Sequence, residues 1–245
     1  MRERRTEPPE GRVETLTSTC EGSGTPIKLR RLMGDVQIIF TVGCAAFVAG
    51  LLWAERNDDQ RLRWLTKPAA SACFIALAVS LGALETSFGQ AILVALIFSA
   101  LGDILLIPDS RATFLAGMAA FALAHGAYAV AFVMSATAIN GPFLMMSGAM
   151  VIFSLAVMRW LWPHLAEMRW PVAVYAAVIG CMVAASPLAV VKGNSPFMLV
   201  VAAALTFAIS DLAVARQQFV TKTFFNPLWG LPLYYGAQVA FAYSV

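Results

Sequence analysis

Charged residues are scarce in this sequence: they make up 13% of its 245 residues, whereas hydrophobic residues make up 60%. Soluble globular domains carry about 25% charged residues, so this composition excludes an ordinary soluble domain. The net charge of +3 is small and spread along the chain, which argues against a nucleic-acid-binding surface. We therefore expect a protein surrounded by membrane lipids, with no nucleic acid among its partners.

Cysteine and histidine are also few. With only two histidines in the chain, a three-histidine zinc site cannot be built. We expect neither a metal nor a cofactor, and we keep a site of two aspartates and one histidine as the metal-binding alternative. The four cysteines form no CxxC pair, so they indicate packing residues rather than disulfides or a zinc site; they are Cys20, Cys44, Cys73 and Cys181.

Apolar stretches of membrane-spanning length dominate the remainder of the sequence. Eight of them follow one another with short links, which predicts an all-α, polytopic transmembrane bundle of eight spans within residues 34–245. Residues 1–33 are rich in charge, Pro, Gly, Ser and Thr, so we expect a disordered polar tail and not a cleavable signal peptide. The predicted spans are 35–53, 67–84, 89–107, 112–134, 143–162, 171–190, 195–215 and 228–244.

An even number of spans places both termini on one side of the membrane, side A, and the links after spans 1, 3, 5 and 7 on side B. Most Lys and Arg residues of the short links fall on side B, which favours side B as cytoplasmic. The basic residues before span 1 argue for the reverse. We expect a multi-pass protein of the bacterial inner membrane, or of the endoplasmic reticulum in a eukaryote; the sequence leaves the oligomeric state open.

Three ionisable groups stand inside the apolar stretches: Asp103, His125 and Asp211. Inserting such a group into a membrane span costs about 3 kcal/mol, so it usually has a function or a partner. Given the direction of each span and the rise of about 1.5 Å per residue, the three groups fall in one layer about 15 Å thick that opens toward side B. The same layer contains Lys67, Tyr234, Tyr235 and Gln238.

Each of these residues also has a purely structural interpretation. The two acids could join helices through polar contacts, or simply pair with Lys67 and His125. Lys67 could be an interfacial anchor, and the two tyrosines could belong to an interfacial belt. Of the 14 acidic residues, however, only Asp103 and Asp211 are embedded, and this contrast favours a functional site.

Five motifs resemble the YhhN family of eight-span membrane proteins, which includes the TMEM86 lysoplasmalogenases. The resemblance runs from about Lys67 to Ser244, and the order and spacing of the motifs make it specific. The motifs are TKP at 66–68, FSALGDILL at 98–106, FLAGMAAFALAHGAY at 114–128, FAISDLAVARQQF at 207–219 and LYYGAQVAFAYS at 233–244.

This resemblance implies a membrane hydrolase that cleaves the vinyl-ether bond of lysoplasmalogens, giving a fatty aldehyde and a glycerophospho-alcohol. A lysophospholipid would then be the substrate, and membrane lipids the surroundings. The motif positions that carry over are Lys67, Asp103, His125, Tyr128, Ser210, Asp211, Tyr234, Tyr235 and Gln238.

The chemistry of vinyl-ether hydrolysis agrees with two embedded acids. Protonation of the alkene carbon gives an oxocarbenium ion that water captures, so the site needs an acid, a negative group and a base. We expect Asp103 and Asp211 to share these roles, with His125 orienting or relaying protons. Lys67, with Arg216, would meet the phosphate. The six motif positions other than the two acids and His125 would bind substrate. They are Lys67, Tyr128, Ser210, Tyr234, Tyr235 and Gln238.

A different class of protein accounts for the same buried groups. A small transporter or proton-coupled channel could use Asp103, His125 and Asp211 as a proton relay. The crowding of polar groups near one side, and the lack of a visible inverted repeat, favour the enzyme. Transport remains the alternative function.

Overall fold

The computed structural model describes residues 27–189 and 197–245. Eight long helices in this part of the chain confirm the predicted all-α bundle. Seven of the described helices are long and apolar enough to cross a membrane; α8, which carries several polar residues and two prolines, is not among them. The eight are α1 (Ile27–Arg56), α2 (Gln60–Ser80), α3 (Ser87–Leu105), α4 (Arg111–Ser135), α5 (Gly141–Leu161), α6 (Arg169–Ala185), α7 (Phe197–Ala215) and α8 (Phe225–Ala242).

Two helices, α1 and α2, begin seven or more residues before the predicted spans. Residues 27–33 of the predicted tail belong to α1, while residues 1–26 lie outside the part that the structure describes. Helix α2 begins at Gln60 rather than at residue 67, and the side chain of Asp59 caps it by accepting a hydrogen bond from the Leu62 N–H at 3.1 Å. The prediction equated the start of the apolar run with the start of the helix. Lys, Arg, Leu and Gln favour helix, however, so a helix continues beyond the apolar part.

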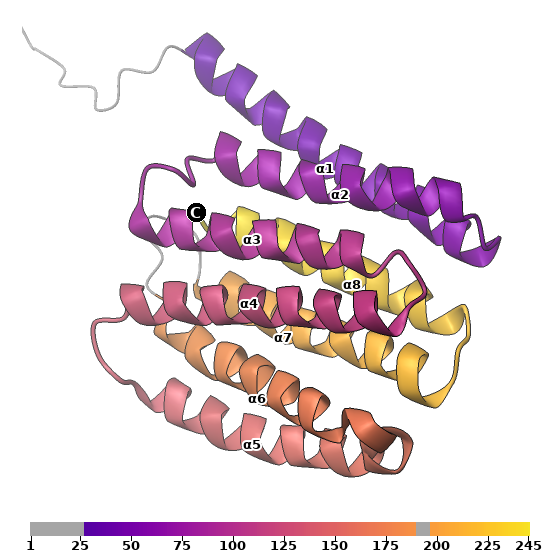
Figure 1. The fold of residues 1–245 in the computed structure, drawn as a ribbon. Coiled ribbons are helices and arrows are strands. Elements are labelled where there is room, and N and C mark those ends of the chain that lie inside the picture. The colour runs from indigo at the N-terminus through magenta and orange to yellow at the C-terminus, as the bar shows by residue number, and fades with distance from the viewer. Residues whose placement is uncertain (1–26, 190–196) are drawn as a thin grey trace, which may run out of the picture.

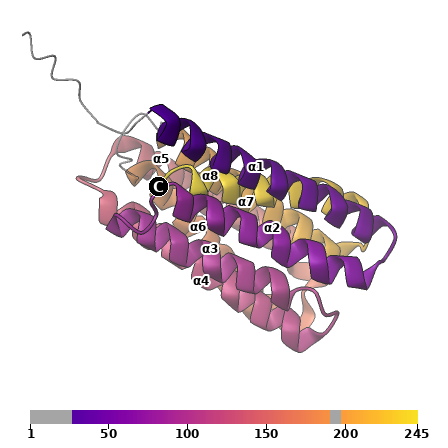
Figure 2. The ribbon, with the colours of Figure 1, turned by 90° about the horizontal axis from the view of Figure 1, so that it is seen from above.

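The helices lie roughly side by side and alternate in direction (Figure 1). We call the end that carries the α1–α2, α3–α4, α5–α6 and α7–α8 links the B end, and the opposite end, where the chain terminates, the A end (Figure 1). Figure 2, turned by 90°, shows that the helix axes remain roughly aligned from above as well. Successive helices pack as antiparallel pairs except α4 and α5, because α4 packs against α6 instead. Helix α8 also contacts α1, α2 and α3, which places it inside the bundle.

Two glycines set the closest helix contacts. A Cβ atom on Gly102 of α3 would lie 2.6 Å from the Phe121 ring of α4, and one on Gly230 of α8 would lie 2.5 Å from Cβ of Ala213 on α7. Small residues of this kind let membrane helices approach closely. Asp103 directly follows Gly102, and Tyr234 follows Gly230 by one turn, so these contacts fix the positions of two polar side chains.

Candidate functional site

Asp103, near the B end of α3, is the centre of the first polar cluster. The residue is 2% exposed, and its Oδ2 atom accepts hydrogen bonds from three hydroxyls. The donors are Ser71 at 2.6 Å, Tyr234 at 2.9 Å and Tyr235 at 3.3 Å. On the other side, Nζ of Lys67 lies 3.8 Å from Oδ1 and donates to the Asp103 backbone carbonyl at 3.3 Å.

Helices α2 and α8 bring these donors together. Lys67 and Ser71 are four residues apart on α2, so they share one face of that helix, and the Ser71 hydroxyl lies 3.1 Å from the Lys67 carbonyl. Two consecutive tyrosines of α8 reach the same carboxylate oxygen. Their ring centroids are 4.7 Å apart in an edge-on arrangement, which lets both hydroxyls converge on Asp103.

Asp211 on α7 is the centre of the second polar cluster. Its Oδ2 atom accepts a hydrogen bond from the Tyr175 hydroxyl of α6 at 3.2 Å and lies 3.3 Å from Nε2 of His125 on α4. The other ring nitrogen, Nδ1, lies 2.6 Å from the Phe121 carbonyl, which can only accept, so Nδ1 carries a proton.

The Nε2 atom of His125 is buried and makes no hydrogen bond within the described part of the chain. Its contact with Asp211 therefore has the distance of a hydrogen bond but not its direction. The ring lies between aromatic neighbours, with Phe207 at 4.3 Å and Tyr175 at 5.6 Å between ring centroids. An unpaired nitrogen next to a carboxylate is a place where a proton can be exchanged.

Both acids line one cavity of about 690 Å³. Lys67, Tyr175 and Tyr234 line it as well, so the two polar clusters share a common space. Phe121 lies on the wall between them, with its ring centroid 5.7 Å from that of Tyr234 and 6.2 Å from that of Phe207.

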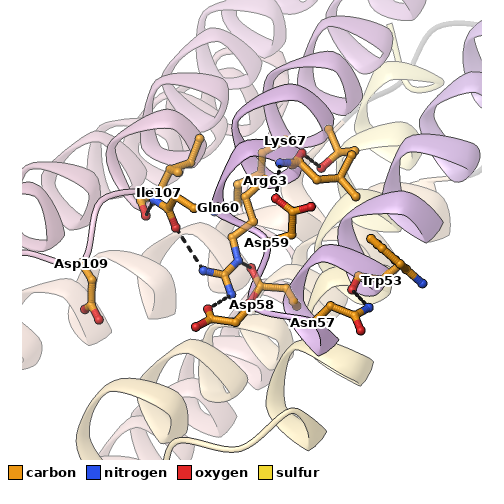
Figure 3. A network of polar contacts seen from close by, with 12 residues as sticks. Trp53, Asn57, Asp58, Asp59, Gln60, Arg63, Lys67, Ile107 and Asp109 are labelled. Carbon is orange, nitrogen blue, oxygen red and sulfur yellow. Dashed lines mark hydrogen bonds and ion pairs between the residues drawn. The ribbon is translucent and has the colours of Figure 1, made fainter.

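The cavity reaches the B end, where its lining becomes polar. Arg63 forms ion pairs with Glu55 at 3.2 Å and with Asp58 at 2.6 Å. Gln60 joins this network to the α3–α4 link by donating to the Ile107 carbonyl at 3.2 Å, and Figure 3 shows the network from close by. Polar residues of both signs therefore surround the cavity mouth, in contrast to its aromatic interior; they include Glu55, Asp58, Gln60, Arg63, Asp109 and Lys222.

One ion pair crosses the mouth between two links. Nζ of Lys222 donates to Oδ2 of Asp109 at 2.9 Å, and both side chains are largely exposed. This hydrogen bond, and next the ammonium charge, lower the pKa of the Asp109 carboxyl below its ordinary value.

Four predicted site residues are not among the residues that line the cavity: His125, Tyr128, Tyr235 and Gln238. Tyr128 donates to Oε1 of Gln238 at 2.6 Å, and Nε2 of Gln238 donates to the Ser99 hydroxyl at 3.3 Å. All three are fully buried, and none is among the residues lining the cavity. Ser210 does line it, but its hydroxyl donates to the Phe207 carbonyl at 2.7 Å.

Arg216 also lies apart from the cavity lining. It begins a π-helical turn (Arg216–Val220) that ends α7, and it donates to Oδ1 of Asn226 at 2.7 Å. Asn226 in turn donates to Gln217 at 2.6 Å. This guanidinium therefore holds the α7–α8 link, whereas the sequence predicted a contact with phosphate.

Sequence reasoning missed Ser71 and Tyr175. The spacing of Ser71, one turn after Lys67, was a signal that could have placed it beside an acid. Tyr175 had no such signal, because nothing in the sequence indicates that α6 lies against His125 and Asp211. Within the described residues, no three His, Cys, Asp or Glu side chains gather as a metal site would require.

Comparisons with known proteins match most of the chain. The model of the YhhN family matches residues 62–245. The chain is 32% identical to lysoplasmalogenase TMEM86A of Bos taurus over 213 residues, which cover 84% of this chain and 85% of the relative. It is 30% identical to lysoplasmalogenase TMEM86A of Homo sapiens, with the same coverage. No solved structure matches the chain.

Proposed function

The chain belongs to the YhhN family, and on this premise we propose that it is an integral membrane hydrolase that cleaves the vinyl-ether bond of lysoplasmalogens. The curated relatives named lysoplasmalogenase support the substrate class. One observation carries the proposal: Asp103 and Asp211 come from different helices and line the same cavity.

The reaction adds one water across an alkenyl ether, R–CH=CH–O–R′, to give R–CH₂–CHO and HO–R′. A proton first adds to the carbon farther from oxygen, and the adjacent carbon becomes part of an oxocarbenium ion. Water attacks that carbon, loses a proton, and the resulting hemiacetal collapses to aldehyde and alcohol. The protein must therefore deliver one proton, stabilise one positive charge and accept one proton.

We assign the proton transfers to Asp211 and His125. Asp211 lies at the cavity wall with a side chain that is 12% exposed, so substrate and water can reach it. In its protonated form it gives a proton to the alkene carbon, and the carboxylate that remains takes the proton from the attacking water. His125, 3.3 Å away through an unpaired nitrogen, holds or relays this proton, and Tyr175 orients the carboxyl oxygen.

We assign the stabilisation of positive charge to Asp103. Three hydroxyls donate to one of its carboxyl oxygens and the Lys67 ammonium lies 3.8 Å from the other, and these four groups favour the charged form of the carboxyl. Fixed dipoles and charges that need no rearrangement during the reaction are the most effective electrostatic groups in an enzyme. Tyr234 donates a hydrogen bond to Asp103 and also lines the cavity. Its hydroxyl is therefore the group of this cluster that can contact a glycerol or ether oxygen.

The phosphate of a lysophospholipid would lie toward the cavity mouth. Lys67, Arg63 and Lys222 are the cations lining the cavity, and they lead from Asp103 to the B end. Tyr128, Tyr235 and Gln238 would act by holding Asp103 and Ser99 in place rather than by contact with substrate. With side B cytoplasmic, the head group would enter from the cytoplasmic face of a bacterial inner membrane or of the endoplasmic reticulum.

The test is aldehyde release by the purified protein in lipid nanodiscs. Lysoplasmenylcholine and lysoplasmenylethanolamine should yield fatty aldehyde, and the saturated alkyl-ether analogues should yield none, because they have no alkene to protonate. Turnover should survive exhaustive chelation. Accumulation of substrate in proteoliposomes without aldehyde would overturn the proposal and favour the transporter.

A further inference from the structure

A second, smaller cavity lies against the same catalytic aspartate from the side of the bilayer. Its volume is about 60 Å³, and residues of α5, α6 and α7 line it. Asp211 and Tyr175 line both this cavity and the large one, and so do Val172 and Ala215. The two spaces therefore meet at the carboxyl to which we assign proton transfer.

The small cavity differs from the large one in chemistry. Apart from Ser154 and the two shared polar residues, Asp211 and Tyr175, its lining is apolar. It opens between membrane-spanning helices, and Phe153 at its edge is 36% exposed. We call this space the α5–α7 cleft.

A lysoplasmalogen needs two different surroundings at once. Its phosphate head requires polar partners, while each buried methylene of its chain gains about 0.8 kcal/mol by leaving water. The large cavity offers polar partners of both signs at the B end, and the cleft offers an apolar opening into lipid. The vinyl-ether bond lies between head and chain, and Asp211 lies between the two cavities.

We propose that the α5–α7 cleft binds the alkenyl chain of the substrate, so that the chain leaves the large cavity sideways past Asp211 and Tyr175 into the bilayer. This inference rests on the proposed function, since a lysophospholipid supplies the chain. It assigns chain selectivity to the cleft, where Gly180 of α6 faces α5. A Cβ atom there would lie 3.3 Å from Oγ of Ser154, so a larger side chain must narrow the cleft.

The first experiment maps the chain without requiring hydrolysis. A saturated alkyl-ether lysophospholipid with a diazirine in the middle of its chain is photolysed with the protein in nanodiscs. We expect cross-links to Phe153, Val157 and Ile179, and their loss when unlabelled lysoplasmalogen competes. A diacyl phospholipid with the same diazirine should label exposed residues of every helix without this competition.

The second experiment narrows the cleft. Gly180→Leu should lower kcat/KM about tenfold for a long alkenyl chain, because the larger side chain takes the place of a few of its methylenes in the cleft. It should lower kcat/KM much less for a four-carbon chain, which places few methylenes there. Gly148→Leu is the matched control: this exposed glycine of α5 has no heavy atom within 4 Å of an added Cβ, and it does not line the cleft. The control should retain the wild-type rates for both chains.

The outcomes separate the two proposals. If aldehyde is released but competed cross-links map to other helices, or if Gly180→Leu lowers both chain lengths equally, the cleft is not the chain site. If cross-links at the cleft are competed but no aldehyde is released, the chain site stands and the hydrolase does not.

Discussion

Asp103 and Asp211 line one cavity, but their surroundings differ in nearly every respect. Three hydroxyls donate to Asp103, Lys67 stands beside it, and its side chain is 3% exposed. Asp211 has one hydroxyl donor and an imidazole nitrogen that makes no hydrogen bond in the described chain, and its side chain is 12% exposed. A carboxylate surrounded by donors is held in one position, whereas one beside an unpaired nitrogen can give and take a proton. Two acids that line the same cavity can therefore differ in their capacity for proton transfer.

The largest expected effect is that of Asp211→Asn. The amide keeps the shape of the side chain and still accepts from Tyr175, but it cannot transfer a proton. Turnover should fall about a thousandfold, in the range typical of a lost general acid–base group, with little change in the thermal unfolding midpoint. Aldehyde release and unfolding in nanodiscs measure the two quantities. Asp35→Asn, an exposed acid of α1, is the matched control; wild-type turnover in Asp211→Asn would remove that residue from the mechanism.

The second effect, that of Asp103→Asn, should combine lost turnover with lost stability. The substitution leaves Lys67 beside a neutral amide, and removing one partner of a buried ion pair costs about 3 kcal/mol or more. We expect turnover to fall about a hundredfold and the unfolding midpoint to fall as well. Adding Lys67→Met should restore stability but not turnover. Recovery of both would show that Asp103 acts only as the structural partner of Lys67.

A third and smaller effect compares two tyrosines that each donate to one of the acids. Tyr175→Phe removes the only hydroxyl that donates to Asp211 within the described residues, so the turnover number should fall about tenfold and the pH profile should shift. Tyr234→Phe leaves two other hydroxyls on Asp103, so the pH profile should stay in place while KM rises. Identical pH profiles for both variants would abolish the distinction between the two acids.

The smallest effect is that of Asp109→Asn at the cavity mouth. Its stability cost serves as a reference for the cost of replacing the two buried acids. Lys222 lowers the pKa of Asp109, so the pair stabilises the fold above the unfolded pKa of about 3.9 and loses that contribution as pH falls through the lower folded value. Solvent screens this pair, so Asp109→Asn should cost less than about 1 kcal/mol at pH 7 and less still at pH 2. Chemical unfolding at both values measures it. A cost that persists at pH 2 would assign another role to Asp109.

The sequence was sufficient for the helices and for locating the two acids within them; the catalytic roles of these acids stay a prediction. Apolar runs indicate the eight helices, seven of which are long and apolar enough to span a membrane within the described residues, and an acid within such a run is conspicuous because so few exist. The pairings that were weighed as a structural alternative, Lys67 with Asp103 and His125 with Asp211, are present in the fold. What the pattern could not supply was which helices are neighbours, and so Tyr175 on α6 was overlooked.

The limits of the prediction at helix ends have a different cause. Hydropathy marks where a helix leaves lipid, whereas capping and backbone hydrogen bonds decide where it begins, as Asp59 and α2 illustrate. The same distinction applies to Gln238 and Tyr128. Their motif suggested contact with substrate, which stays a prediction; in the fold, Tyr128 donates to Gln238 and Gln238 donates to Ser99.

The contact between Gly230 and Ala213 couples the position of α8 to that of α7. One side of this helix touches α7 with almost no side chain between them, and the next turn holds Tyr234 against Asp103. Any outward displacement of α7, whether by a thicker bilayer or by a methyl group added at Gly230, would therefore be transmitted to the Tyr234 hydroxyl on α8 and through it to Asp103 on α3. The distance between α7 and α8 therefore depends on the absence of a side chain at Gly230.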